Sequence, residues 1–266
     1  MTAGSRQPRL RSLVAVFCVF YLIAPTAIVL GASFTNTAQI RFPPDGFTLR
    51  WYAEILSNER TWHALTNSLY VALISVVISL VAGVPAAMTL PKLSGPRRVI
   101  IAVALSLGLS TPPIVSAFGL YGVFSQLQVI HSVVVVGVAV GIVNFPFMLW
   151  AVGSALEGEN AALPQAAATL GARPFEQFLY VRLPVIMPGI ITGALLVFVS
   201  SLTDYVISQV LTNVDDVTLP VYIYSSLRTT ISPALGAACG IFILLTAVVF
   251  AGALKAGNVE RFLYRD

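Results

Sequence analysis

Residues 129–156 read VIHSVVVVGVAVGIVNFPFMLWAVGSAL, and this stretch decides the class of fold. It contains no lysine, arginine, aspartate or glutamate. It is also longer than the roughly 20 apolar residues that an α-helix needs to cross the hydrocarbon core of a bilayer. The stretch therefore predicts a membrane-spanning helix.

Five other apolar stretches have a similar length: Leu13–Phe34, Leu65–Leu90, Val99–Phe124, Ile186–Leu211 and Leu235–Ala256. Across the chain 57% of residues are hydrophobic and 10% are charged, and the mean hydropathy is +0.88. A soluble domain carries roughly 25% charged residues, so most of this surface must face lipid. The sequence predicts an all-α integral membrane protein with about six transmembrane helices.

The basic residues predict how the helices are oriented in the membrane. Placing the N-terminus in the cytoplasm puts Arg41, Arg50, Arg60 and Arg228 outside and the remaining lysines and arginines inside. Cytoplasmic loops carry such an excess of positive charge. We therefore expect both termini to be cytoplasmic, and we attribute the sequence pI near 9.3 to membrane topology rather than to nucleic-acid binding.

The first apolar stretch has a second interpretation, a cleaved signal peptide, because Arg6, Arg9 and Arg11 precede it. Signal peptides have apolar regions of about 7–15 residues, whereas this one is longer and contains Pro25. We favour a retained helix. The predicted organisation is then a cytoplasmic N-terminus (1–12), one transmembrane domain (13–257) and a cytoplasmic tail (258–266).

The second inside loop, residues 157–184, contains two helix signals. Pro164 suits the first turn of a short helix, and Gly171 supplies the left-handed residue that ends one. Pro174 then opens a second helix, with Phe175, Phe178 and Leu179 at i, i+3 and i+4. Spacing alone leaves two alternatives, a linker packed on the end of the bundle or a segment that enters a groove on a partner.

This loop resembles the EAA loop of ABC-importer permeases, whose signature is Glu-Ala-Ala, a glycine four residues later and a closing Leu-Pro. The matching residues are Gln165-Ala166-Ala167, Gly171 and Leu183-Pro184. Residues 46–52, 201–208 and 219–225 resemble other segments of the spermidine/putrescine class of these permeases. The resemblance implies the type I importer (MetI-like) fold and a place in the bacterial inner membrane.

The resemblance also implies partners. In such importers two permeases form the pore, two ATPase subunits bind ATP and Mg, and an extracytoplasmic binding protein delivers the solute. We expect a paralogous permease as the partner in the lipid bilayer. Docking of the loop on the ATPase would involve Leu163, Pro164, Gln165, Ala166, Ala167, Ala168, Gly171 and Ala172.

The chain carries no ATPase motif or cofactor site of its own. A P-loop needs G-x-x-x-x-G-K-[ST], yet Lys92 follows Pro91 and Lys255 follows Leu254. Cys18 and Cys239 are isolated in apolar stretches and indicate neither a disulfide nor a metal site. We therefore expect a transporter subunit rather than an enzyme.

Two departures from the family pattern bear on function. Gln165 replaces the first Glu, so a hydrogen bond to the ATPase there is neutral and about half as strong as a charge-assisted one. The polyamine patterns Pro-Asp-Ile-Val and Ser-Leu-Asp-Asp are here Pro112-Pro113-Ile114-Val115 and Ser201-Leu202-Thr203-Asp204. Two carboxylates that could guide a polycation are absent. Importers of aminobutyrate, opines or aminoalkylphosphonates are therefore rivals to a polyamine importer.

Asp204 is the acidic residue that falls inside a predicted span. A carboxylate at mid-bilayer costs about 2.5–3.5 kcal/mol, so it usually faces a cavity or a partner. Asp204, with Thr203 and Tyr205, is predicted to line the solute pathway and to select an amine. The alternative is a structural hydrogen bond or snorkelling to the interface.

Proline interrupts two predicted spans, at Pro112-Pro113 and at Pro146. Broken backbone at membrane depth is tolerated where it is buried or lines a cavity. Ser110, Thr111 and Asn144 therefore either belong to a gate beside the solute or satisfy carbonyls freed by packing kinks. Tyr222, in the loop predicted before the last helix, either touches the entering solute or belongs to an interfacial belt.

Rivals of other classes are an ATP-independent secondary transporter or channel and a non-transporting scaffold. A secondary transporter would require an inverted repeat or an intramembrane ion relay, and the sequence indicates neither. A scaffold would not require polar breaks in its spans. Neither explains the loop 163–184.

Overall fold

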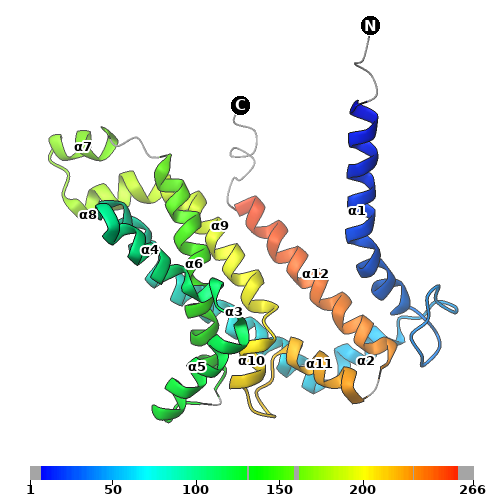
Figure 1. Ribbon diagram of the computed structural model, residues 1–266. Coiled ribbons are helices and arrows are strands. Elements are labelled where there is room, and N and C mark those ends of the chain that lie inside the picture. The colour runs from blue at the N-terminus through cyan, green and yellow to red at the C-terminus, as the bar shows by residue number, and fades with distance from the viewer. Residues whose placement is uncertain (1–6, 131, 159–161, 230, 257–266) are drawn as a thin grey trace, which may run out of the picture. The chain divides into compact units, whose positions relative to one another are not determined.

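The computed structural model describes residues 7–130, 132–158, 162–229 and 231–256 (Figure 1), and all regular structure in these ranges is helical. The helices in chain order are α1 (Gln7–Ala32), α2 (Arg50–Ser57), α3 (Glu59–Thr89), η1 (Leu90–Lys92), α4 (Gly95–Ser110), α5 (Pro113–Gln126), α6 (Val133–Glu157), α7 (Ala162–Thr169), α8 (Pro174–Gln177), η2 (Phe178–Arg182), α9 (Leu183–Leu202), α10 (Val206–Leu211), α11 (Leu219–Thr229) and α12 (Pro233–Ala256). The tail 258–266 and the first half of the segment 1–12 lie outside the described residues.

Five helical segments are long and apolar enough to cross a membrane: Ser12–Ala32, Glu59–Lys92, Val133–Glu157, Pro174–Leu202 and Pro233–Gly252. Helices α4 and α5 together pass the same test as a bent pair. Counted as one broken span, the pair makes six in the described ranges. The all-helical class and the count of about six spans are confirmed.

The third predicted span, Val99–Phe124, is not one straight helix. Its two halves, α4 and α5, meet at an angle of 101°. Thr111 and Pro112 have extended backbone with ψ of 137° and 131°, because a residue that precedes proline is pushed out of the helical region. Pro113 then begins α5, where its missing N–H is not needed. The double proline is therefore the physical cause of the break.

The fifth predicted span, Ile186–Leu211, is shifted in the structure. The helix begins at Pro174, continues through the π turn η2 and ends at Leu202. Pro184 has no N–H for the usual helical bond to the carbonyl of Tyr180, and the π turn lies just where that bond is missing. The chain then breaks at residues 203–205 before α10.

The chain forms two compact units, one of Met1–Thr61 with Ile223–Leu245 and one of Trp62–Tyr222 with Thr246–Asp266. In the second unit α6 is the central helix, and its most extensive packing is against α9. The close approach depends on glycine: a Cβ on Gly189 would lie 2.7 Å from the carbonyl oxygen of Ala151, and one on Gly193 would lie 2.8 Å from Sδ of Met148. Small residues four apart favour such contacts between membrane helices.

Helix α3 packs on α6 through serine and glycine. The hydroxyl of Ser75 donates to the carbonyl of Gly137 at 2.9 Å, and that of Ser79 donates to Gly141 at 3.2 Å. Both serines are buried, so each hydroxyl finds an acceptor on the neighbouring backbone instead of in water. The helix pair is thus joined by polar contacts at mid-bundle.

In the first unit, the short helix α2 carries a buried tryptophan. Trp51 is 7% exposed, and its Nε1 donates to the carbonyl of Thr35 at 2.8 Å. It packs in a cluster with Ile55 and the small residues Ala234, Ala237 and Ala238 of α12. Because α12 offers no bulky side chain there, the indole fills the space.

Candidate functional site

Helix α7 lies beyond the ends of α6 and α9 (Figure 1). Most of its side chains are exposed, including those of Leu163, Gln165, Ala166 and Ala168, while Ala167 is half-buried. Leu170, directly after the helix, is 88% exposed. A linker packed on the bundle end would bury such apolar side chains. The exposure therefore favours the alternative in which this segment meets a partner.

The C-terminal end of α7 is fixed by Gly171, as predicted. Its φ is +87°, the left-handed region that glycine adopts without strain. The N–H of Gly171 donates to the carbonyl of Ala168 at 3.0 Å, and the N–H of Ala172 donates to that of Ala167 at 3.0 Å. This pair of bonds is a Schellman motif, which satisfies carbonyls that a helix end leaves open.

The chain then turns sharply into α8. The backbone N–H of Arg173 donates to Oε2 of Glu176 at 2.8 Å, and Nε2 of Gln177 donates to the carbonyl of Ala172 at 2.7 Å. These bonds hold the corner between α7 and the span that begins at Pro174. Phe178 packs on the core cluster around Met148, whereas Phe175 is 71% exposed, so the three predicted residues do not share one buried face.

At mid-bundle Asn144 joins α6 to α9. It is buried; its Nδ2 donates to Oγ of Ser201 at 3.1 Å, and its Oδ1 accepts from Oγ of Ser200 at 3.2 Å. Helix α6 runs through Pro146 without a break. Asn144 therefore bonds a neighbouring helix and does not repair a carbonyl freed by the proline.

The hydroxyls of Ser110 and Thr111 bond carbonyls of their own helix, but not those of Gly108 and Leu109, which Pro112 and Pro113 leave without an N–H donor. The hydroxyl of Thr111 donates to the carbonyl of Leu107 at 2.7 Å, and that of Ser110 donates to Ser106 at 3.4 Å. Ser110 is exposed and Thr111 half-buried. They end α4 at the double-proline break.

Two helix breaks flank the middle of α6. On one side, Gly108 of α4 approaches so closely that a Cβ there would lie 2.8 Å from the carbonyl oxygen of Val143. On the other side, Ser201 of α9 bonds Asn144 one residue before that helix ends. The segments that follow the breaks, α5 and α10, pack on each other through a core that includes Ala117, Ile207 and Leu211. Both breaks thus lie at the level of Val143 and Asn144.

Asp204 lies in the second break and not within a helix, which corrects the predicted placement. Its Oδ2 accepts hydrogen bonds from the N–H of Ser208 at 2.9 Å and from the hydroxyl of Ser208 at 3.0 Å. The carboxylate thereby holds the first turn of α10. Thr203 is exposed and donates back to Val199 at 3.0 Å, and Tyr205 is half-buried. A role of Asp204, Thr203 and Tyr205 in the solute path stays a prediction.

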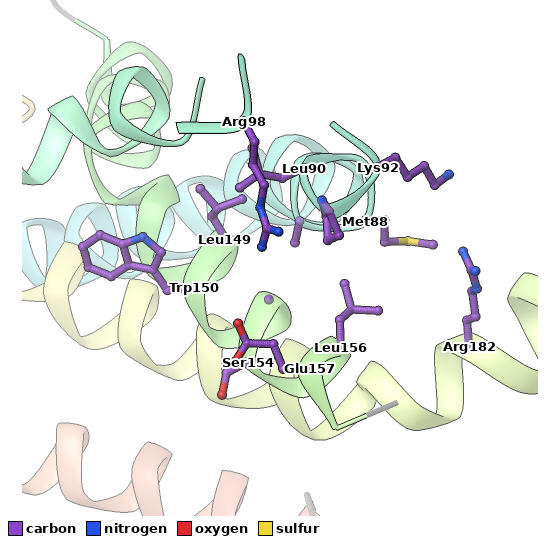
Figure 2. Close-up of a pocket in the computed structure, with 13 residues that line it drawn as sticks. Met88, Leu90, Lys92, Arg98, Leu149, Trp150, Ser154, Leu156, Glu157 and Arg182 are labelled. Carbon is purple, nitrogen blue, oxygen red and sulfur yellow. The ribbon is translucent and has the colours of Figure 1, made fainter. Parts of the chain in front are cut away.

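A cavity of about 450 Å³ opens where α3, η1, α6 and η2 end and α4 begins, beside the loop of residues 157–184 (Figure 2). Its walls carry three cations, Lys92, Arg98 and Arg182, and one carboxylate, Glu157. Apolar side chains, among them Leu149 and Trp150, complete it. Sequence reasoning used these basic residues only to orient the chain, since no local motif links four separate segments.

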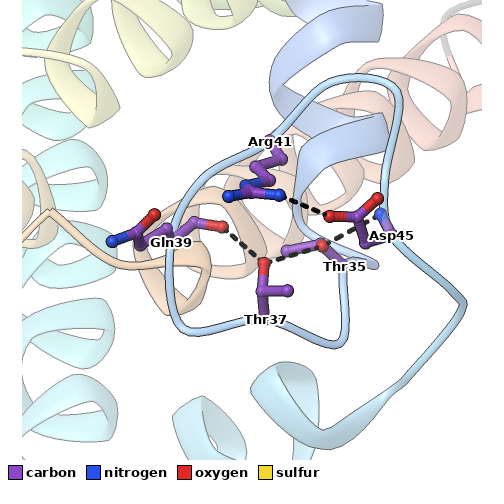
Figure 3. Close-up of polar contacts among 5 residues, drawn as sticks. All are labelled: Thr35, Thr37, Gln39, Arg41 and Asp45. Atoms are coloured by element: carbon purple, nitrogen blue, oxygen red, sulfur yellow. Dashed lines mark hydrogen bonds and ion pairs between the residues drawn. The ribbon is translucent and has the colours of Figure 1, made fainter.

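On the predicted outer side, residues 35–48 form a loop closed on itself (Figure 3). The hydroxyl of Thr37 donates to the carbonyl of Gln39 at 2.9 Å, and the N–H of Asp45 donates to Oγ1 of Thr35 at 3.2 Å. Arg41 and Asp45 form an exposed salt bridge of 3.0 Å. Such a surface pair contributes at most about 1 kcal/mol, so the polar bonds around Thr35 matter more for the loop's shape.

The segment before the last span is a helix, α11, and not the predicted loop. Tyr222 is half-buried in it, and its N–H donates to the carbonyl of Thr218 at 2.9 Å. On the same helix Arg228 donates to the hydroxyl of Tyr224 at 3.1 Å and lies over its ring. The i, i+4 spacing of these two residues was the signal for a helix here.

Comparison with protein families gives one match for the chain. The model of the binding-protein-dependent transport system inner membrane component matches residues 79–256, which is more than half of the sequence. The matched part includes the loop of residues 157–184, the polar contacts of Asn144 and both helix breaks.

Similar curated proteins are permeases of polyamine systems. The chain is 28% identical to the spermidine/putrescine transport system permease protein PotC of Escherichia coli (strain K12), over 86% of each chain. It is 27% identical to the putrescine transport system permease protein PotI of the same strain, over 85% of this chain and 83% of PotI. The likeness thus extends along most of the sequence.

Solved structures of a bacterial ABC transporter that imports alginate have the same fold. One matches with a TM-score of 0.70 at 19% identity, over 96% of this chain and 99% of the other. A second, in complex with an alginate-bound periplasmic protein, matches with a TM-score of 0.71 at 15% identity, over 98% and 96%. At this identity the likeness concerns the fold alone. By sequence and by fold, the chain belongs to the family of binding-protein-dependent transport system inner membrane components, the permease subunits of ABC importers.

Proposed function

We propose that this permease forms one half of a pathway that imports a small organic amine of the polyamine class, such as spermidine or putrescine. Hydrolysis of ATP takes place on separate ATPase subunits, which bind ATP and Mg. A paralogous permease supplies the other half, and an extracytoplasmic binding protein delivers the solute. The polyamine permeases PotC and PotI support this proposal through their likeness over most of the chain.

The observation that carries the coupling role is the exposure of α7 together with its fixed C-terminal end. The Schellman motif at Gly171 and the corner bonds at Arg173 hold the helix in a defined direction. The exposed Leu163 and Leu170 give it an apolar surface that can enter a groove. A rigid helix loses little entropy on docking, so it can transmit a closing motion of the ATPase.

The solute path is proposed to follow the two helix breaks beside Val143 and Asn144. Irregular backbone at membrane depth is typical of places where a helix lines a cavity or is buried by neighbours. Asp204 places a carboxylate in the second break, and an amine is a suitable partner for its charge. Two carboxylates of the polyamine pattern are absent, so aminobutyrate, opines and aminoalkylphosphonates remain alternative solutes for the same proposed importer.

Co-purification with the ATPase subunit tests the coupling role. We expect Leu170→Asp to reduce the recovered ATPase at least about tenfold, because one desolvated apolar contact at the centre of an interface contributes about 2 kcal/mol or more. Leu170 is 88% exposed, so the charge does not disturb packing within the chain.

The matched control is Val214→Asp. Val214 is 92% exposed but lies in the loop between α10 and α11, and we expect its variant to recover the ATPase as the wild type does. Equal recovery with Leu170→Asp and wild type would remove the coupling role from this loop. Equal loss with both variants would point to a general effect of added negative charge and would also contradict the proposal.

A further inference from the structure

The basic cavity lies beside the proposed coupling loop (residues 157–184), and its apolar and basic lining residues occupy different parts of its wall. Figure 2 shows Trp150 and Leu149 toward one end, Lys92 and Arg182 toward the other, and Arg98 reaching between them. Within the described ranges, neither Lys92 nor Arg98 forms a salt bridge within 4 Å. Three cations against Glu157 leave a net positive charge on the lining. The cavity therefore suits an anion with an apolar portion.

The size and position of the cavity limit which anionic ligand it can bind. A volume of about 450 Å³ accommodates a headgroup with part of a chain, and small-molecule sites start near 300 Å³. Trp150 is 52% exposed, and exposed tryptophan near the end of a membrane helix is typical of the membrane interface. Basic pockets between membrane helices on the cytoplasmic side bind anionic headgroups. At this position the amphiphilic anion that the protein encounters in the membrane is an anionic phospholipid.

We propose that this cavity binds an anionic phospholipid. Its phosphate lies among Lys92, Arg98 and Arg182, and the start of an acyl chain lies along Leu149 and Trp150. Arginine donates in a fork that matches two phosphate oxygens, and lysine adds a point charge. The lipid would fill a site that this chain builds from α3, η1, α4, α6 and η2.

Such a lipid would connect two parts of the molecule. Glu157 is the last residue of α6 before the loop, and Arg182 ends η2 in the span that follows the loop. Lys92 ends η1 after α3, and Arg98 lies in the first turn of α4. Bridging them would hold the segments next to the loop against the junction of α3 and α4. This consequence for coupling rests on the proposed function, whereas lipid binding itself does not.

The amount of lipid that stays bound to the purified protein tests the proposed site directly. The full-length chain, purified with its partner subunits, is exchanged into vesicles of phosphatidylethanolamine with increasing phosphatidylglycerol, and bound lipid is read by native mass spectrometry. We expect Arg98→Gln and Lys92→Gln each to weaken phosphatidylglycerol binding about tenfold, since each variant loses a charge-assisted hydrogen bond to the phosphate.

Arg97→Gln is the matched control. Arg97 is the neighbour of Arg98 on α4, carries the same charge and is absent from the cavity lining. Equal phosphatidylglycerol binding by wild type and Arg98→Gln, or equal loss with Arg97→Gln, would overturn the proposal. A further arm adds inorganic phosphate without the anionic lipid. Thermal protection by phosphate equal to that by phosphatidylglycerol would identify a soluble anion and would likewise overturn it.

Because this readout involves no ATPase, its failure is distinct from failure of the coupling role. Loss of the lipid site with normal ATPase recovery would leave the proposed function standing. Normal lipid binding with no ATPase recovery would leave the lipid site standing.

Discussion

At the scale of single residues, Asp204 illustrates what a polar side chain does in an apolar chain. Hydropathy places it inside a span, yet Asp204 lies after the end of α9 and its carboxylate holds the start of α10 through Ser208. The sequence contained the i, i+4 pair of Asp204 and Ser208, but a pair of this kind equally fits a continuous helix. Only the course of the backbone after Leu202 distinguishes a helix break at Asp204 from a continuous helix.

Replacing Asp204 by asparagine removes the negative charge but keeps an oxygen that can accept the hydrogen bond from Ser208 at the start of α10. Asparagine caps a helix start about as well as aspartate, so we expect Asp204→Asn to keep wild-type thermal stability. If the charge selects an amine, uptake of labelled putrescine by the reconstituted importer falls about tenfold, in keeping with the loss of one charge-assisted bond.

Asp204→Ala is the companion variant. It removes the cap as well, which costs about 1 kcal/mol, so it should lose both stability and uptake. Wild-type uptake of putrescine by Asp204→Asn would show that the negative charge does not select the solute.

At the scale of helices, backbone proximity organises the second unit. Gly189 and Gly193 place α9 against α6, and Ser75 and Ser79 bond across to Gly137 and Gly141. In a bilayer the hydrophobic effect does not drive helices together, so close packing and shared hydrogen bonds must do so. Small residues at four-residue spacing therefore replace the large apolar side chains of a soluble core.

Gly189→Ala tests this packing. A Cβ at Gly189 would meet backbone of α6, 2.7 Å from the carbonyl oxygen of Ala151 and 3.1 Å from Cα of Val152, and backbone cannot rotate away. We expect a loss of about 1–3 kcal/mol in stability, read as a lower melting temperature in detergent.

Gly119→Ala on α5 is the control, since nothing lies within 4 Å of its Cβ position. Alanine has the higher helix propensity, so this variant should be neutral or slightly stabilising. A melting temperature for Gly189→Ala equal to that of Gly119→Ala would contradict the packing argument.

Sequence patterns predicted some helical features and not others, for physical reasons. Apolar length predicted the spans, and Gly171 predicted the end of α7, because both depend on local chemistry. A helix opening at Pro174 was predicted, but its continuation into the fifth span was missed, because the π turn that carries the helix past Pro184 has no local sequence signal. The burial of Trp51 was missed because it depends on α12, which is remote in sequence.

At the scale of the whole molecule, charge placement predicts topology. The described ranges contain up to six spans, and the basic residues divide unequally between the two predicted sides. The orientation follows from that asymmetry alone, and the single transmembrane domain over 13–257 likewise stays a prediction.

Cysteine labelling tests the orientation. In a chain whose Cys18 and Cys239 are replaced by alanine, we compare Val214→Cys and Leu170→Cys, two highly exposed positions on opposite predicted sides. A membrane-impermeant maleimide added to intact spheroplasts should label Val214→Cys. It should label Leu170→Cys only after the membrane is opened. The reverse pattern would invert the predicted topology.

The π turn at Phe178–Arg182 has a consequence for how this gene can change in length. Elsewhere in a continuous helix, loss of one codon rotates everything beyond it by about 100° and turns a lipid-facing side inward. A π turn contains one residue more than an α-helical turn, so loss of one codon there returns the helix to regular geometry and leaves the faces of α9 in place. The π turn is therefore a point within this span at which we expect the loss of one residue to be tolerated better than elsewhere in the helix.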